Sequence, residues 1–231
     1  MSAYPSPNCG PRRDDARPDI VVIHYTATPG VEPARTWLCS PEAEVSAHYL
    51  VAPDGAVEQL VAEADRAWHA GAGAWGDVTD VNSRSIGIEL VNAGSDPFPD
   101  AQMTALEALL DGIVARWGVP PERVIGHSDM APGRKIDPGP LFDWGRLARR
   151  GLAIAVRVPW WRRLLRRVDA ARFRADLARA GYTAEAAPEV LLQAFRLRHR
   201  PGATGPLGRA DCALAAELAR RFPVDRGRPA A

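Results

Sequence analysis

Residues 20–23, Ile-Val-Val-Ile, form the stretch that most constrains how this 231-residue chain can fold. A short apolar run without alternation is typical of a strand that is buried on both faces of a sheet. A second β-rich run covers residues 85–91, and residues 124–125 form a third, shorter one. The sequence therefore predicts a central, mostly buried sheet.

Helical patterns alternate with these strands. Residues 100–117 carry apolar side chains along one helical face, and Gly118 can end that helix. Shorter helices are expected near residues 33–38 and 143–151, and residues 46–61 predict two strands joined by a turn. The expected fold class is α/β (α+β), with a central mixed β-sheet flanked by helices and followed by a small all-α bundle.

The character of the sequence changes after Gly151, where basic residues become frequent. Tryptophan and leucine lie on one helical face just beyond this point and arginine lies on the other, and three further helical stretches follow. The expected segments are an α/β domain at 1–152 with an extended arm at 1–18, a basic amphipathic linker at 153–168, a helical bundle at 169–222 and a disordered tail at 223–231.

Composition excludes several classes of function. The formal net charge is +1, so no overall field favours a nucleic-acid partner. The three cysteines are widely separated and disfavour both a disulfide framework and a thiolate zinc site. No run approaches the ~20 apolar residues of a membrane span, and the first residues lack the pattern of a signal peptide. We therefore expect a cytoplasmic location.

The tryptophan- and leucine-bearing face at residues 160–168 leaves two alternatives open. It could touch an anionic membrane surface, or it could pack on a neighbouring domain, which is the more common case. Packing is favoured, so no membrane contact is expected. An RNA- or membrane-binding module built on residues 146–200 is a further alternative, but it would leave the histidines described next without a role.

Two histidines directly follow short strands, His24 after the first run and His127 after the third. Asp137 lies in a proline-stiffened loop beyond His127. Two imidazoles and one carboxylate can hold a catalytic zinc ion and leave a fourth coordination position open. The spacing alone does not select this set, because His48 or His69 could complete a three-histidine site.

Five motifs stand in order along the chain: IVVIHYTAT, VSAHYLVAPDG, RAWHAG, SIGIEL and GHSDMAPGRKIDPGPLFDW. In this order they resemble the zinc-dependent N-acetylmuramoyl-L-alanine amidases of the AmpD/AmiD type. That family shares its fold with bacteriophage T7 lysozyme and the animal peptidoglycan recognition proteins. The resemblance covers about residues 5–150, and the last motif is very specific.

The resemblance implies a role for each of five residues. It places Zn²⁺ on His24, His127 and Asp137. It makes Glu89 the general base, which takes a proton from water and returns it to the leaving amine. Lys135, the only lysine of the chain, would stabilise the oxygen that becomes negative in the tetrahedral intermediate, where a compact ammonium fits better than a planar guanidinium.

Candidate substrate contacts surround this set. An aromatic face suits a sugar ring, whereas an arginine could pair either with a carboxylate of the stem peptide or with an acid of the protein itself. The candidates are Tyr25, Arg66, Trp68, His69 and Arg134. His48 is expected to pack near the site in a structural role.

The implied function is zinc-dependent hydrolysis of the amide bond between N-acetylmuramic acid, in its ordinary or 1,6-anhydro form, and L-alanine. The expected partners are peptidoglycan fragments of cell-wall turnover and recycling, with no obligate protein partner. The alternative is a non-catalytic protein that recognises muropeptides, which loss of a zinc ligand or of Glu89 would mark. The bundle resembles the peptidoglycan-binding bundle of AmiD-type amidases, although GATGPLGR replaces its usual polar pattern.

Overall fold

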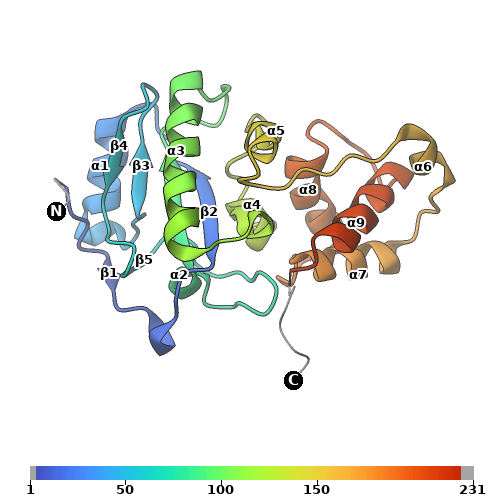
Figure 1. Cartoon of the computed structure of the whole chain (residues 1–231), viewed down its shortest axis with the longest axis horizontal. Coiled ribbons are helices and arrows are strands. Elements are labelled where there is room, and N and C mark those ends of the chain that lie inside the picture. The colour runs from blue at the N-terminus through green and yellow to red at the C-terminus, as the bar shows by residue number, and fades with distance from the viewer. Residues whose placement is uncertain (1–3, 225–231) are drawn as a thin grey trace.

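The structure is a computed structural model that describes residues 4–224. A sheet with its helices forms one end of the molecule, and a helical bundle forms the other. The short helices α4 (His127–Met130) and α5 (Trp144–Arg149) lie between them (Figure 1). The strands of the central sheet are β2 (Ile20–Tyr25), β3 (Tyr49–Val51), β4 (Val57–Gln59), β6 (Ser85–Leu90) and β7 (Val124–Gly126). A separate small sheet pairs β1 (Cys9–Gly10) with β5 (Arg66–Ala67).

The central sheet has the strand order β4-β3-β6-β2-β7. β3, β6, β2 and β7 run parallel, and β4 is antiparallel at the edge. The expected mixed sheet is therefore confirmed. His24 on β2 is in register with Glu89 on β6, and Ile23 is in register with Ile88. Since side chains alternate along a strand, the polar pair shares one face of the sheet and the isoleucine pair shares the other.

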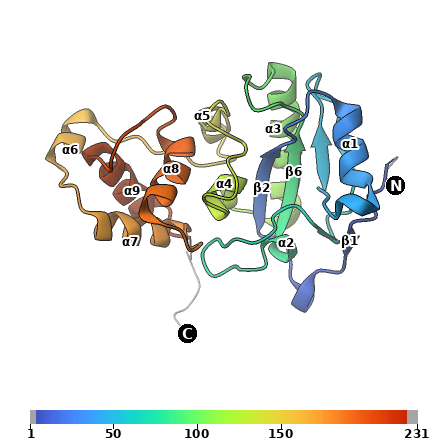
Figure 2. The ribbon, with the colours of Figure 1, turned by 180° about the vertical axis from the view of Figure 1, so that it is seen from behind.

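The helix α3 (Asp100–Trp117) covers the face that carries the isoleucines, as Figure 2 shows from behind. Its buried apolar residues recur every three or four positions, which places them on one side of the helix. They are Met103, Leu106, Leu110 and Ile113. Gly118 ends the helix in the left-handed conformation, at φ 69°, which glycine adopts without strain.

The remaining helices follow the sequence patterns, except α2, which the sequence analysis did not predict. On the sheet side they are α1 (Val31–Cys39) and α2 (Val81–Arg84), and in the bundle they are α6 (Trp160–Leu165), α7 (Ala170–Ala180), α8 (Pro188–His199) and α9 (Arg209–Arg221). Asp169 caps α7, because its carboxylate accepts a hydrogen bond from the backbone N–H of Arg172 at 2.8 Å.

The bundle joins the second face of the sheet through a continuous core, with α4 between them. Ile20, Val22 and Ile125 of the strands belong to the same buried cluster as Met130 of α4 and Phe173 and Leu218 of the bundle. The strand that leads to His24 is therefore linked to the bundle through α4. The domain boundaries expected from the sequence stay predictions.

Residues near both ends of the described range contact this body. In the expected arm, Arg12 is buried and donates to the backbone oxygens of Glu63 and Ser83 at 2.7 and 2.8 Å. Most of the expected tail falls on residues 225–231, outside the described residues, but Val224 is buried and its N–H donates to the Arg179 oxygen at 2.9 Å.

The apolar face of α6 does not pack on a neighbouring domain, which corrects the preferred expectation. Trp160 and Leu165 are exposed, with 72% and 78% of their surface accessible. Within residues 4–224, no helix combines the length and apolar character needed to cross a bilayer.

A buried ion pair joins the bundle to α4. Arg198 of α8 donates to Asp129 at 2.7 Å, and their side chains are only 3% and 0% exposed. The hydroxyl of Tyr182 donates to the other oxygen of Asp129 at 2.6 Å. Asp129 also accepts from the Gly126 N–H at 2.9 Å, so this cluster fixes the turn from which His127 projects.

We predict that Arg198→Ala lowers the free energy of unfolding by about 3–5 kcal/mol, because it leaves the buried Asp129 carboxylate without its cationic partner. Urea denaturation measures this loss. The control is Arg220→Ala, which removes an exposed pair with Glu217 on α9 and should leave the denaturation midpoint unchanged. Equal effects of the two substitutions would contradict the role given to the buried pair.

Candidate active site

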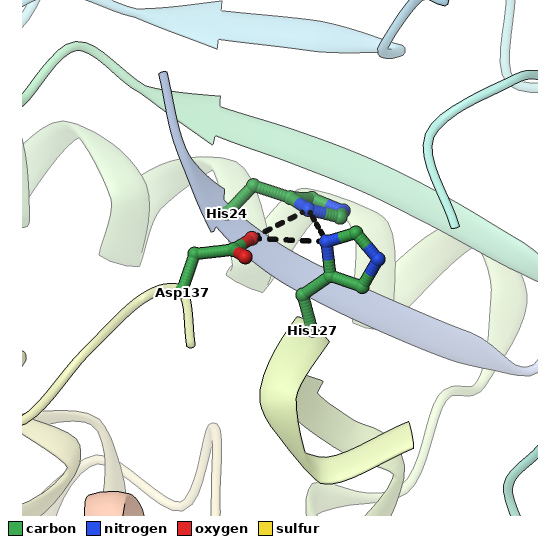
Figure 3. A group of neighbouring side chains, drawn as sticks. All are labelled: His24, His127 and Asp137. Carbon is green, nitrogen blue, oxygen red and sulfur yellow. Dashed lines mark hydrogen bonds and ion pairs between the residues drawn. The ribbon is translucent and has the colours of Figure 1, made fainter. Parts of the chain in front are cut away.

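Three side chains from separate elements meet at one point (Figure 3). His24 comes from β2, His127 from the first residue of α4, and Asp137 from the loop after α4. The Nδ1 atoms of the two histidines are 2.9 Å apart, and Asp137 Oδ2 lies 2.9 and 3.0 Å from them. All three residues are buried, and together they form a group that could hold a metal ion.

The far nitrogen of His127 determines which of its ring atoms can bind a metal. His127 Nε2 lies 2.9 Å from the backbone oxygen of Ala70. A carbonyl oxygen only accepts hydrogen bonds, and this contact is shorter than the 3.3 Å from Arg134 Nη2 to the same ring nitrogen, so Nε2 carries the proton. His127 Nδ1 is then left with a lone pair that points at the other two ligands.

A longer relay fixes His24 in the same tautomer. The hydroxyl of Ser85 donates to the Val81 oxygen at 2.5 Å, so the Ser85 oxygen accepts from His69 Nε2 at 3.1 Å. His69 Nδ1 is thereby free of a proton and accepts from His24 Nε2 at 3.0 Å. Consequently His24 Nδ1 also presents a lone pair to the centre of the cluster.

This donor set fits a small divalent cation. Two unprotonated nitrogens and a carboxylate oxygen repel one another at these distances unless a positive charge lies among them. Burial and the neighbouring His127 lower the pKa of His24 to about 4, which keeps its ring neutral and able to act as a ligand. Tetrahedral Zn²⁺ with bonds near 2.1 Å places its ligands about 3.4 Å apart, a few tenths of an ångström more than the separations found here.

The other two histidines named as alternative ligands lie outside this group. His48 Nδ1 accepts from the Gly87 N–H at 2.9 Å, and its Nε2 lies 3.1 Å from the Asp65 oxygen, so both of its nitrogens are engaged elsewhere. His69 stands behind His24 as its hydrogen-bond acceptor. This position gives His69 a supporting role, not one in the substrate groove.

Glu89 shares the face of the sheet that carries His24. Its Oε2 is buried and has no hydrogen-bond partner within residues 4–224. Burial, and next the negative charge of Asp137, raise the pKa of Glu89 to about 8, while Lys135 acts in the opposite direction. A carboxyl group with such a pKa can exchange a proton near neutral pH.

Lys135 and Arg134 occupy the loop between α4 and Asp137, and both residues are exposed. Lys135 lies within electrostatic reach of Glu89 and His24, since its charge lowers the pKa of each. Arg134 donates to the Ala72 oxygen at 3.0 and 2.6 Å and holds this loop against residues 70–72.

The remaining candidate contacts are more scattered. Tyr25 is half-buried, and burial, followed by the charge of Asp137, raises the pKa of its hydroxyl. Arg66 donates to Asp80 at 3.0 Å and to the Ser83 hydroxyl at 3.1 Å. Of the two roles considered for Arg66, the structure therefore shows pairing with an acid of the protein itself. Trp68 is half-buried on the segment before His69.

Sequence reasoning missed the residues that orient the ligands. Ser85, the Ala70 oxygen and Asp129 bind no metal, and each acts only through tertiary contacts. A partial signal existed for Asp129, which stands three residues after Gly126 and caps the turn there. No pattern in the sequence predicts the contact of the Ala70 backbone oxygen with His127.

We predict that Gly87→Ala weakens zinc binding by about 10- to 100-fold, the usual effect of losing a group that orients a ligand. A Cβ at Gly87 would lie 2.4 Å from Cγ of His69 and would push that ring away from His24. Competition with a chromophoric chelator measures the affinity. Gly10→Ala is the control, because its Cβ would meet no atom within 4 Å. Unchanged affinity in Gly87→Ala would rule out the relay through His69.

We predict that Glu89→Gln stabilises the metal-free protein at alkaline pH. The folded protein holds the Glu89 proton up to about pH 8, whereas the unfolded chain releases it near 4.5. The free energy of unfolding therefore falls between these pH values in the wild type, and glutamine removes this fall. The melting temperature of the variant should match the wild type in acid and exceed it above pH 8. A difference between the two proteins that does not change with pH would contradict this account.

A matched control for the pH dependence is Glu107→Gln. The ion pair with Arg146 lowers the pKa of Glu107, so its charge stabilises the fold at neutral and alkaline pH. This substitution should lower the melting temperature at the pH where Glu89→Gln raises it.

Comparison with known proteins shows the family to which this chain belongs. The family model described as N-acetylmuramoyl-L-alanine amidase matches residues 14–140. The N-acetylmuramoyl-L-alanine amidase AmiD of Escherichia coli (strain K12) is 37% identical over 89% of this chain and 84% of its own length. The 1,6-anhydro-N-acetylmuramyl-L-alanine amidase AmpD of Enterobacter cloacae is 36% identical over 62% of this chain and 85% of its own length.

Two solved structures resemble nearly the whole molecule. E. coli AmiD in complex with the substrate anhydro-N-acetylmuramic acid-L-Ala-D-γ-Glu-L-Lys superposes with a TM-score of 0.80, at 32% identity over 96% of this chain and 93% of that one. AmpDH3 of Pseudomonas aeruginosa in complex with anhydromuramic pentapeptide gives 0.80 at 30% identity, over 90% of this chain and 93% of that one. These matches confirm the resemblance carried by the five motifs: the chain belongs to the N-acetylmuramoyl-L-alanine amidase family of enzymes.

Proposed function

We propose that the chain hydrolyses the amide bond between the lactyl carbonyl of N-acetylmuramic acid and L-alanine in peptidoglycan fragments, with Zn²⁺ as cofactor. The observation that carries the proposal is the convergence of two histidine lone pairs and one carboxylate on the sheet face of Glu89, whose buried Oε2 has no hydrogen-bond partner within residues 4–224. Zinc held by His24, His127 and Asp137 would supply Lewis-acid polarisation of the carbonyl and acidify a bound water.

Glu89 handles the proton in this proposal. The ionised form of Glu89 accepts a proton from the attacking water and passes it to the nitrogen of the leaving L-alanine, and its raised pKa makes it a stronger base than an exposed carboxylate. Because Oε2 has no partner within the described chain, no internal hydrogen bond has to break first. A structural carboxylate in this place would need a cationic or hydrogen-bonding partner.

Lys135 stabilises the negative oxygen that develops as the carbonyl carbon becomes tetrahedral. Its ammonium stands on the exposed loop that leads to Asp137, so it can approach a bound substrate from the solvent side. Tyr25 and Arg134 border the same loop and are the remaining substrate contacts that we propose, together with Trp68.

For the substrate we propose anhydromuropeptides, the ligands named in the complexes of the two similar structures. A groove of about 1030 Å³ runs from Lys135 and Ile136 to the bundle, where Val190 and Leu207 line it. It offers room beside the reacting bond for a larger wall fragment, which supports a peptidoglycan-binding role for the bundle. The cytoplasmic location expected from the sequence stays a prediction.

The test is incubation of the protein with a defined anhydromuropeptide, with and without a chelator, and analysis of the products by mass spectrometry. We expect release of a peptide that begins with L-alanine, loss of this activity in chelator and its return with Zn²⁺. Cleavage within the glycan, or cleavage that chelators do not affect, would reject the proposal. Tight binding without any cleavage would favour the recognition protein instead.

We predict that Lys135→Arg lowers kcat by about 10²- to 10³-fold, since a group that stabilises the developing oxyanion is typically worth this much. The guanidinium keeps the charge but spreads it over a planar fork, which fits a single oxygen poorly. Zinc content and melting temperature should equal those of the wild type. Turnover close to the wild-type value would remove Lys135 from the mechanism.

A further inference from the structure

The segment at residues 157–168 carries an unusual share of the exposed apolar surface. Within residues 4–224, ten large apolar residues are exposed, and five of them belong to this segment. They are Trp160, Trp161, Leu164, Leu165 and Val168, with exposed fractions between 48% and 78%. The spacing of the first four places them on one side of α6, where they form a single stripe and not scattered side chains, and Val168 follows three residues after the helix ends.

The polar side of α6 is the side that holds it to the protein. Arg163 donates through Nε to the Val158 oxygen at 2.8 Å, and Arg166 pairs with the buried Asp176 of α7 at 3.3 Å. Arg209 of α9 donates to the Leu164 oxygen at 2.9 Å. A surface helix of a globular protein normally turns its apolar side inward, so α6 has the reverse orientation.

Positive charge surrounds the stripe. Arg157, Arg162 and Arg167 are exposed, and the Arg162 guanidinium lies over the ring of Trp161, 5.2 Å from its centre. The acids on the neighbouring helices are already engaged, Asp176 with Arg166 and Arg172, and Glu217 with Arg220. The stripe therefore presents tryptophan and leucine among exposed guanidinium groups.

The stripe lies at the end of the molecule that is remote from the sheet. Both ribbon views place α6 at the outer edge of the bundle and α1 at the opposite edge (Figures 1 and 2). A partner surface bound to α6 would therefore not cover the candidate active site, which is formed by β2, α4 and the loop to Asp137.

We propose that residues 157–168 dock this protein on the surface of an anionic phospholipid bilayer. Tryptophan and leucine enter the interface between headgroups and acyl chains, and the arginines pair with lipid phosphates. This goes beyond the proposed hydrolysis and does not depend on it.

Two other occupants fit the stripe less well. A nucleic acid has phosphates for the arginines, but it offers nothing to Leu164, Leu165 and Val168. A second copy of the chain would cover the leucines but would bring two sets of arginines together, which opposes association. A bilayer with anionic headgroups satisfies both kinds of side chain at once.

The test is flotation of the full chain with phosphatidylcholine vesicles that contain or lack phosphatidylglycerol. We expect binding to the anionic vesicles, weakening with added salt. The double substitution Trp160→Ser/Leu165→Ser should reduce the partition coefficient by about tenfold or more, because it removes the two most exposed members of the stripe. Arg162→Gln/Arg167→Gln should reduce binding to anionic vesicles and weaken its salt dependence, because it removes two of the three exposed arginines.

The matched control is Trp37→Ser, which removes a tryptophan that is 61% exposed on α1 and should leave vesicle binding unchanged. Melting temperatures equal to the wild type show that the variants are folded, as expected for exposed positions. The proposal is overturned by no binding to anionic vesicles, by equal binding to both kinds of vesicle, or by an equal effect of Trp37→Ser. Self-association that the double substitution abolishes, without vesicle binding, would assign the stripe to a second copy.

Discussion

The proton positions on two buried imidazoles determine what the centre of this molecule can do. The Ala70 oxygen accepts a hydrogen bond from the Nε2–H of His127. His69, which itself donates to Ser85, accepts one from the Nε2–H of His24. Each hydrogen bond leaves an Nδ1 lone pair aimed at Asp137. Reversing either tautomer would put a proton between two ligands and remove the site for a cation. Metal binding, the role of Glu89 and the proposed hydrolysis all depend on this arrangement.

The fold holds these groups against considerable opposing forces. A carboxyl oxygen without a hydrogen-bond partner and two facing lone pairs destabilise a buried site, and such destabilisation persists only where the surrounding structure overcomes it. Here a parallel sheet positions His24 beside Glu89 by strand register, and the bundle fixes the turn before His127 through Asp129 and Arg198. The helical bundle is thus part of the support of the site, whatever it binds.

Much of the fold follows from periodicity in the sequence. The strand at residues 20–23, the helix at 100–117 and the three helices of the bundle appear where apolar spacing predicts them. The three converging ligands came from the motifs, because spacing alone left His48 and His69 open. What could not be predicted depends on tertiary contacts: the backbone oxygen of Ala70, the pairing of Arg66 with Asp80, and the outward orientation of α6. A helical pattern shows which residues share a face, but not which way that face points.

Histidine tautomers can be read directly from long-range ¹H–¹⁵N correlation spectra of the zinc-loaded protein, and this measurement tests the account at its centre. The account predicts that His24 and His127 both carry their proton on Nε2 and bind the metal through Nδ1. A spectrum that shows either ring protonated on Nδ1 with zinc bound would contradict the arrangement from which the site and its chemistry were derived.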